Sequence, residues 1–159
     1  MLKPIASPLN LVLVSPQIPP NTGNVARLCA VTGSRLILIE PLGFSIDDRS
    51  LKRAGLDYWD KVFLKLYSSY QEYVAAHVSS RRVYFSSKAN QSYFDFRFAE
   101  GDHLVFGSET SGLPDALLEA EKERAVTIPM LPQSRCLNLS TSVGVATYEA
   151  LRQIQMTLK

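Results

Sequence analysis

Short apolar runs that alternate with segments of helical spacing constrain the fold of this chain more than any other feature. The clearest runs, LNLVLV and RLILIE, have the apolar content of strands that are buried on both faces. The predicted strands are residues 9–14, 35–40, 62–66, 83–86, 104–107 and 126–128. The predicted helices run from about residue 25 to Gly33 and over residues 47–55, 69–78, 114–120 and 138–158.

This alternation predicts an α/β fold, in which a parallel sheet carries helices on both faces. Ligands of such sheets bind outside the carboxyl ends of the strands, so the loops at those ends are the places to look for a site. The longest predicted helix carries one apolar stripe, formed by Leu139, Val143, Ala146, Ala150 and Ile154. We expect residues 9–159 to form a single domain and residues 1–8, which contain two prolines, to form a flexible extension.

The composition excludes several classes of protein. With 46% hydrophobic and 20% charged residues the chain is neither disordered nor collagen-like. Its net charge of +2 excludes a strongly basic protein that wraps nucleic acid, although a local basic patch remains possible. No apolar run approaches the roughly 18 residues of a membrane span. Cys29 and Cys136 lie far apart, which favours reduced thiols in a cytoplasm over a disulfide or zinc site.

The first unusual loop, PPNTGNVAR, covers residues 19–27. Asn21 or Thr22 is a candidate N-cap of the helix that follows, and Gly23 allows close approach of another backbone. Arg27 then lies about one turn inside a helix whose N-terminus attracts anions. The alternative is a capped helix with an arginine that only faces solvent.

The second loop, FGSETSGLP, covers residues 106–114. Gly107 and Gly112 bracket a tight turn, as expected where backbone must approach a ligand or pass through a narrow space. Glu109 could accept hydrogen bonds from several backbone amides and brace the loop. The loop lacks the G-x-G-x-x-G pattern and the P-loop lysine, so these nucleotide-phosphate motifs do not apply.

The third loop, IPMLPQSRCLNLSTSV, covers residues 128–143 and is too apolar for an ordinary solvent loop. We expect it to fold into the wall of a pocket, where its backbone could recognise a planar, partly apolar ligand such as an adenine ring. Asn138 and Ser140 suit the start of the last helix. Tyr148 follows about three turns later.

Other residues give weaker indications. His77 and His103 lack the spacing of metal ligands, and each is expected to be a structural or surface histidine, so we predict no metal site. Tyr58 and Trp59 fit a core or an interface better than a platform for stacking bases. The candidate RNA contacts are Asn21, Arg49, Lys52, Arg53 and Arg135. Three of them, Arg49, Lys52 and Arg53, follow the second predicted strand, and such a run of charges is also typical of a solvated helix face.

Taken together, the three loops resemble the three motifs of the SPOUT superfamily of trefoil-knotted RNA methyltransferases. Residues 21–27 resemble motif one, residues 106–114 motif two and residues 128–143 motif three, in the same order and with the same spacing. The segments EPLGF (40–44) and RAGLDY (53–58) narrow the resemblance. They are similar to those of the minimal, single-domain family that 2′-O-methylates the wobble nucleotide, cytidine or uridine 34, of leucine tRNAs.

This resemblance implies a C-terminal trefoil knot, a homodimer, a tRNA anticodon stem-loop as substrate and S-adenosyl-L-methionine as methyl donor. The implied cofactor-binding positions are Phe85, Ser86, Gly107, Glu109, Gly112, Ile128, Leu131, Cys136 and Leu137. Two of them depart from the family, which often has a smaller aliphatic residue at position 85 and serine at position 136. Contacts made through the backbone would survive both changes.

Arg27 is the implied catalytic residue, because the matching arginine of the family is linked to activation of the target hydroxyl. A guanidinium stays protonated, so stabilising a developing alkoxide or holding the adjacent phosphate asks less than literal base catalysis. Tyr148 and Asn138 are secondary candidates near the same site.

Three alternatives remain at this point. One is 2′-O-methylation of ribosomal RNA or of another tRNA position, although larger relatives of that kind usually carry an added RNA-binding domain. Another is a knotted RNA-binding protein without catalysis, against which the presence of Arg27 argues. The third is a generic dinucleotide-binding domain, which the missing glycine fingerprint disfavours.

Overall fold

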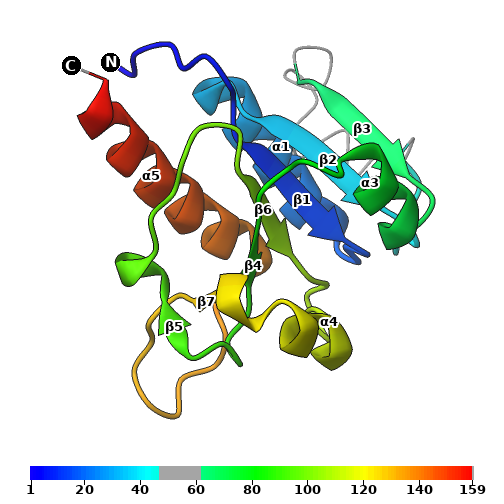
Figure 1. The fold of residues 1–159 in the computed structure, drawn as a ribbon. Helices are drawn as coiled ribbons and strands as arrows, with labels where there is room; N and C mark the ends of the chain where they lie inside the picture. The colour runs from blue at the N-terminus through cyan, green and yellow to red at the C-terminus, as the bar shows by residue number, and fades with distance from the viewer. Residues whose placement is uncertain (47–61, 159) are drawn as a thin grey trace.

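A seven-stranded parallel sheet organises the molecule (Figure 1). The computed structural model describes residues 1–46 and 62–158. Within these residues the strand order is β3-β2-β1-β6-β4-β7-β5, and neighbouring strands run parallel throughout. The strands are β1 (Asn10–Val14), β2 (Arg35–Ile39), β3 (Leu64–Tyr67), β4 (Arg82–Phe85), β5 (Gln91–Ser92), β6 (His103–Phe106) and β7 (Ala125–Thr127).

All six predicted strands are confirmed, within two residues at each end. The additional strand, β5, has only two residues, and both are polar. It therefore carries no apolar pattern that a sequence-based prediction could use. The helix predicted at residues 47–55 and the residues Tyr58 and Trp59 lie outside the described residues.

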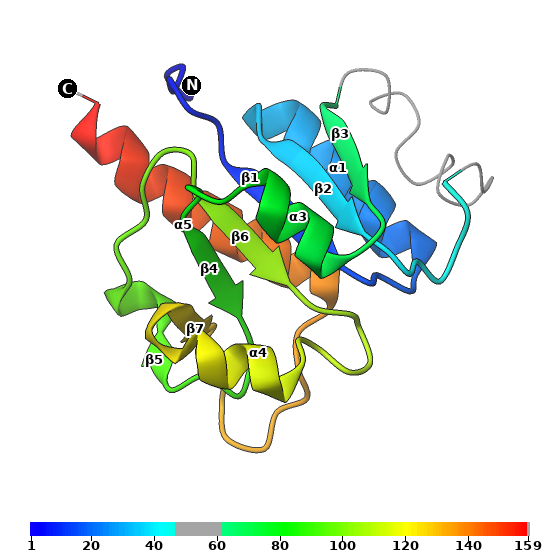
Figure 2. The ribbon, with the colours of Figure 1, turned by 45° about the vertical axis from the view of Figure 1, so that its right-hand side comes forward.

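Helices cover both faces of the sheet, as predicted (Figures 1 and 2). They are α1 (Pro19–Thr32), α3 (Tyr70–Ala76), α4 (Asp115–Ala120) and α5 (Leu139–Thr157), with 3₁₀ turns at Tyr93–Asp95 and Lys122–Arg124. Helices α1 and α5 lie side by side on one face, whereas α3 and α4 lie on the other.

Successive residues of each central strand point to opposite faces, and both faces are buried. On β1, Leu11 and Leu13 belong to the core beneath α1 and α5, whereas Val12 belongs to the core beneath α3 and α4. Leu104 and Val105 of β6 divide in the same way. Burial on both faces explains why these strands read as continuous apolar runs without polar alternation.

Helix α1 begins earlier in the chain than predicted. Pro19 and Pro20 form its first turn, where a missing N–H costs nothing. Ile18 is the N-cap residue and makes no side-chain capping bond, so the prediction of a cap at Asn21 or Thr22 is wrong. Arg27 consequently lies about two turns inside the helix rather than one.

The sequence predicts correctly where α1 ends and where α5 begins. Gly33 ends α1 with φ 72°, in the left-handed conformation that glycine adopts without steric cost. Asn138 caps α5, since its Oδ1 accepts hydrogen bonds from the backbone N–H of Ser140 at 2.9 Å and of Thr141 at 3.3 Å. All five residues of the predicted α5 stripe are buried.

The N-terminal residues lie along the end of α5, so that both termini lie at one end of the molecule (Figure 1). The backbone N–H of Lys3 donates to Gln155 Oε1, and Gln155 Nε2 donates to the carbonyl oxygen of Lys3, both at 2.8 Å. The expected extension therefore makes defined contacts with the domain, and its flexibility stays a prediction.

Both histidines belong to an aromatic cluster between α3 and the sheet. The buried His103 contacts the hydroxyl of Tyr73 through Nδ1 at 2.7 Å, and His77 contacts the hydroxyl of Tyr67 through Nε2 at 2.8 Å. Burial, with a smaller contribution from the neighbouring His77, lowers the pKa of His103 to about 4. These contacts confirm the structural role predicted for the two side chains.

Candidate active site

The described residues form a hollow of about 480 Å³ at the carboxyl ends of β4, β6 and β7. Small-molecule sites of parallel sheets occur at this end and have this range of volume. Three loops and the start of α1 surround the hollow. Its lining residues are Ile18, Asn21, 85–88, 106–113, Thr127, Ile128, Met130, 136–139 and Ser142. Residues from all three predicted loop segments therefore contribute to one site, although the first of these segments, residues 19–27, is the start of α1 rather than a loop.

The 107–113 loop folds back tightly on its own backbone. A Cβ atom at Gly107 would lie 2.0 Å from the carbonyl carbon of Gly112 and 2.2 Å from the backbone nitrogen of Leu113. Gly112 has φ 66°, which glycine tolerates best. The close approach of backbone that was predicted from the two glycines is confirmed within this loop.

The Glu109 carboxylate joins this loop to the start of α1. It accepts hydrogen bonds from the backbone N–H groups of Gln17 at 2.7 Å and Ile18 at 3.1 Å, and from Asn21 Nδ2 at 3.1 Å. The predicted bracing role is thus confirmed, but the amides belong to another loop. Glu109 also satisfies donors near the first turn of α1, where no side-chain cap is present.

Asn21 extends this network to the last helix. Its Oδ1 accepts a hydrogen bond from Asn138 Nδ2 at 2.9 Å, while its Nδ2 donates to Glu109. The Asn21 residue is only 4% exposed, and both ends of its amide are bonded within the chain. This geometry favours a positioning role for Asn21 over the RNA contact predicted from the sequence, and Asn138 lies directly at the hollow.

The 128–138 loop contributes less to the wall than predicted. Ile128, Met130, Cys136 and Leu137 line the hollow, but Leu131 is 80% exposed and does not. The middle of the loop projects from the domain (Figure 1). The expectation that this segment folds into a pocket wall is therefore confirmed for its two ends, whereas the middle of the loop, including Leu131, stays outside the wall.

The floor of the hollow includes aromatic rings at the strand ends. Phe85 stacks on Phe106 with ring centroids 4.6 Å apart and an interplanar angle of 13°. The backbone of Phe85 continues into a turn formed by Ser86, Ser87 and Lys88. Ser87 and Lys88 were not among the predicted site residues, and their only sequence signal is that they directly follow two that were.

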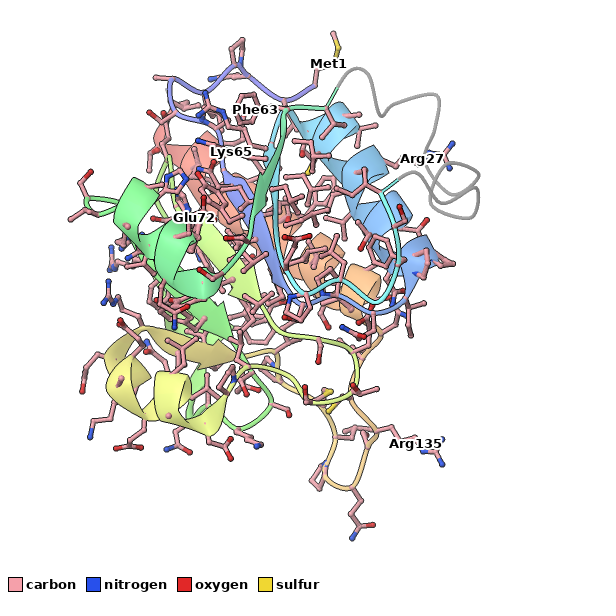
Figure 3. All side chains as sticks on the ribbon, turned by 90° about the vertical axis from the view of Figure 1, so that its right-hand side faces the viewer. Met1, Arg27, Phe63, Lys65, Glu72 and Arg135 are labelled. Atoms are coloured by element: carbon pink, nitrogen blue, oxygen red, sulfur yellow. The ribbon has the colours of Figure 1, made fainter. Side chains whose placement is uncertain are left out.

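Two predicted catalytic residues lie outside the hollow in a single chain. Arg27 and Tyr148 are exposed, on α1 and α5 respectively, and neither lines the hollow. In Figure 3, Arg27 projects from α1 and Arg135 projects from the 128–138 loop, well away from each other. The predicted RNA contacts Arg49, Lys52 and Arg53 lie outside the described residues.

The described residues also bear on metal binding and on membrane insertion. Residues 1–46 and 62–158 contain no group of three or more His, Cys, Asp or Glu side chains that could hold a metal ion. None of the helices described for this chain has the length and apolar content needed to cross a membrane.

Comparison with known proteins identifies the family. A model of the SpoU rRNA Methylase family matches residues 8–148, which is most of the chain. The chain belongs to this SpoU methylase family. The membership predicted from the three loops is thereby confirmed.

Curated members of the SpoU family match nearly the whole chain. A protein of Burkholderia cenocepacia (strain HI2424) is 49% identical over 147 residues, which cover 91% of this chain and 94% of the relative. A protein of Escherichia coli (strain K12) is 46% identical over 147 residues, which cover 92% and 94%. Both are named tRNA (cytidine(34)-2'-O)-methyltransferase.

Solved structures of SpoU relatives share the fold. One, described as "Structural insights into the 2-OH methylation of C/U34 on tRNA", superposes with a TM-score of 0.89 at 45% identity and covers 96% of this chain and 99% of its own. The SpoU methyltransferase AviRb from Streptomyces viridochromogenes, solved in complex with AdoMet, has a TM-score of 0.79 at 24% identity over 94% of this chain and 59% of its own. This second likeness supports the fold alone.

Proposed function

We propose that this protein transfers the methyl group of S-adenosyl-L-methionine to the ribose 2′-oxygen of nucleotide 34, cytidine or uridine, in leucine tRNAs. The observation that carries the proposal is the single hollow formed by all three motif loops at the carboxyl end of the sheet. The 46–49% identity to curated tRNA (cytidine(34)-2'-O)-methyltransferases supports the same reaction.

The residues around the hollow fit this methyl donor. Phe85, Ile128 and Leu137 offer apolar surface suited to an adenine ring, and Ser86 and Thr127 offer hydroxyls at the strand ends. Backbone groups of the 107–113 loop also line the hollow. Contacts that the cofactor makes with backbone atoms do not depend on side chains, so they remain available although Phe85 and Cys136 differ from the residues common in the family. When bound, the cofactor supplies an activated methyl group on a sulfonium centre.

The role of the chain's own residues is to position the 2′-oxygen and to ease loss of its proton. Asn138 lies at the hollow with its amide oriented by Asn21 and by the first turn of α5. Arg27 would stabilise the negative charge that develops on the ribose oxygen or hold the neighbouring phosphate. Arg135 on the projecting loop adds positive charge that can meet the RNA backbone.

In a homodimer, Arg27 of one chain would reach the hollow of the partner chain, since it does not line the hollow of its own chain. The exposed faces of the adjacent helices α1 and α5 carry large apolar side chains, including Val31 at 58% exposure and Val145 at 38%. Exposed apolar side chains on two adjacent helices favour a surface that a partner covers. We infer that this face forms the dimer interface and that Arg27 and Tyr148 approach the site of the partner chain.

The trefoil knot and a cytoplasmic location are further parts of this proposal. The chain leaves β7 near one edge of the sheet and returns as α5, which packs on α1 and β6 near the centre. The segment between β7 and α5 passes the 107–113 loop on this path, which supports the proposal that the C-terminal part of the chain is threaded through a knot there. A tRNA substrate supports a location in the cytoplasm.

The test is mass spectrometry of nucleosides from purified leucine tRNA, incubated with the protein and isotopically labelled S-adenosyl-L-methionine. We expect one labelled methyl group on the ribose of nucleotide 34. Labelled ribose at another tRNA position, or in ribosomal RNA offered in parallel, would reassign the substrate. Absence of labelling from all RNAs, with folded protein, would refute the methyltransferase proposal.

A further inference from the structure

The turn that follows β4 lies between the other two walls of the hollow. One of those walls is the 107–113 loop with α4 behind it, and the other is the 128–138 loop. The turn is held locally, because the backbone N–H of Lys88 donates to Ser86 Oγ at 3.1 Å and that of Ala89 donates to the Ser86 carbonyl at 3.2 Å. The backbone positions from which the side chains of Ser87 and Lys88 extend are therefore held in place.

Lys88 connects the turn to the first of these walls. Its Nζ lies 2.6 Å from Asp115 Oδ1, and Lys88 also lines the hollow. Asp115 is the first residue of α4, and Leu113, two residues before it, is 2% exposed and packs in the core. The ion pair thus crosses from the end of β4 to the wall that follows β6.

Ser87 connects the same turn to the second wall. Its Oγ accepts a hydrogen bond from Cys136 Sγ at 3.5 Å, at the place where the 128–138 loop returns to the sheet. Two consecutive residues therefore make contacts in two directions, one to each wall. Among the described residues, these contacts make the β4 turn a junction of the three loops around the hollow.

We propose that Lys88 is a positioning residue whose ion pair with Asp115 latches the walls of the hollow and slows release of the bound methyl donor. This inference rests on the proposed function, because it assumes that S-adenosyl-L-methionine occupies the hollow. The side chains of Lys88 and Asp115 are 61% and 77% exposed, so their pairing contributes little to global stability. Its consequence is local, since it sets the separation of two loops.

The experiment measures the dissociation constant and the dissociation rate of S-adenosyl-L-methionine for the full-length protein without RNA. Lys88→Ala and Asp115→Ala should each raise the dissociation constant about two- to fivefold, which is the size expected for one exposed ion pair. The increase should appear in the dissociation rate. The double variant should be no weaker than either single variant, because both remove the same contact.

Exchanging the charges of Lys88 and Asp115 distinguishes an effect of their ion pair from an effect of merely removing either side chain. The variant with Lys88→Asp and Asp115→Lys should recover most of the affinity that either alanine variant loses. Near 1 M salt the unmodified protein and Lys88→Ala should bind alike, because salt screens exposed pairs. Lys122→Ala is the matched control, since Lys122 forms an exposed pair with Glu119 at 3.6 Å and does not line the hollow.

Additive effects of the two alanine substitutions, or an unchanged dissociation rate, would overturn the proposal. It would equally fail if each variant lowered the unfolding temperature of the cofactor-free protein in proportion to its loss of affinity, because that result indicates a general structural role. Failure of the unmodified protein to bind S-adenosyl-L-methionine would instead count against the proposed function.

Discussion

Arg27 is the residue whose position most affects the interpretation of this site. It lies on the exposed side of α1, about two turns from the helix start, and does not line the hollow of its own chain. The contacts that shape the hollow come instead from Glu109, Asn21 and Asn138. Removal of Arg27 should therefore leave the cofactor site intact.

Arg27→Ala should reduce methyl transfer about a hundred- to a thousandfold, or roughly 3–4 kcal/mol, if the guanidinium acts mainly on the transition state. Affinity for S-adenosyl-L-methionine should change little. Arg27→Lys should restore activity poorly, because lysine keeps the charge but loses the planar fork. The measurement is single-turnover methylation of a leucine-tRNA anticodon stem-loop, with cofactor affinity determined in parallel.

The matched control is Arg97→Ala, since Arg97 is also exposed but lies between the 3₁₀ turn at Tyr93–Asp95 and β6. This surface change should cost less than about 0.5 kcal/mol. Near-normal turnover of Arg27→Ala would disprove the catalytic assignment. Tyr148 and Asn138 would then be the next side chains to replace.

The two cysteines should differ sharply in reactivity. Burial raises the pKa of Cys29 to about 12, so its thiolate is scarce at neutral pH, whereas Cys136 is exposed at the hollow. N-ethylmaleimide should therefore label Cys136 first, and saturating S-adenosyl-L-methionine should slow that labelling. Peptide mass spectrometry identifies the labelled residue, and Cys136→Ser serves as the unlabelled control. Equal labelling rates with and without cofactor would place the cofactor away from Cys136.

At the scale of elements, the 107–113 loop should not tolerate a side chain at its first position. Gly107→Val should abolish detectable cofactor binding, because its Cβ would overlap the backbone of Gly112 and Leu113 and force the loop open. Gly144→Ala is the control, since a Cβ there meets nothing within 4 Å. Calorimetric titration with S-adenosyl-L-methionine gives the result. Unchanged affinity in a folded Gly107→Val variant would place the site elsewhere.

The contact between α3 and β6 should make stability depend on pH. The pKa of His103 is about 4 in the folded chain and 6.5 when unperturbed, so between these values the unfolded chain binds a proton that the folded chain does not. The free energy of unfolding should therefore fall as the pH drops from about 6.5 to 4, by at most about 3 kcal/mol. The lowered pKa of His77, which is more exposed, contributes in the same direction.

Urea unfolding at a series of pH values measures this dependence. His103→Gln should flatten the curve below pH 6.5, because glutamine does not titrate and still offers an acceptor to the Tyr73 hydroxyl. Curves of equal slope for the two proteins would show that His103 is not the group responsible.

At the scale of the whole molecule, the proposed dimer predicts that two inactive chains can restore one active site. Arg27→Ala keeps an intact hollow, whereas Gly107→Val keeps an intact Arg27. If Arg27 acts across the interface, mixed dimers of these variants contain one complete site and should methylate tRNA. If Arg27 acts on its own chain, the mixture should stay as inactive as either variant.

The mixture is prepared by unfolding both variants together and refolding them, with each variant refolded alone as the control. Light scattering at micromolar concentration should report a dimer for the unmodified protein. An active monomer would remove the dimer from the proposed function altogether.

The sequence by itself determined six of the seven strands, the end of α1, the start of α5 and the three segments that meet at the hollow. Strands such as β1 are buried on both faces, so their local apolar pattern suffices to locate them. Gly33 and Asn138 were recognisable in the same way, because capping depends on neighbours in the chain. The family followed from motif order, which is also a property of the chain alone.

Tertiary structure alone decided what each loop residue contacts. Glu109 could be predicted to accept amide hydrogen bonds, but its partners lie about ninety residues away, at Gln17 and Ile18. The burial of Asn21, the projection of Leu131 and the Lys88–Asp115 ion pair likewise depend on segments that only the folded sheet brings together. Local pattern reports the preference of a segment for helix or strand, whereas side-chain contacts depend on groups that are distant in sequence and near in space.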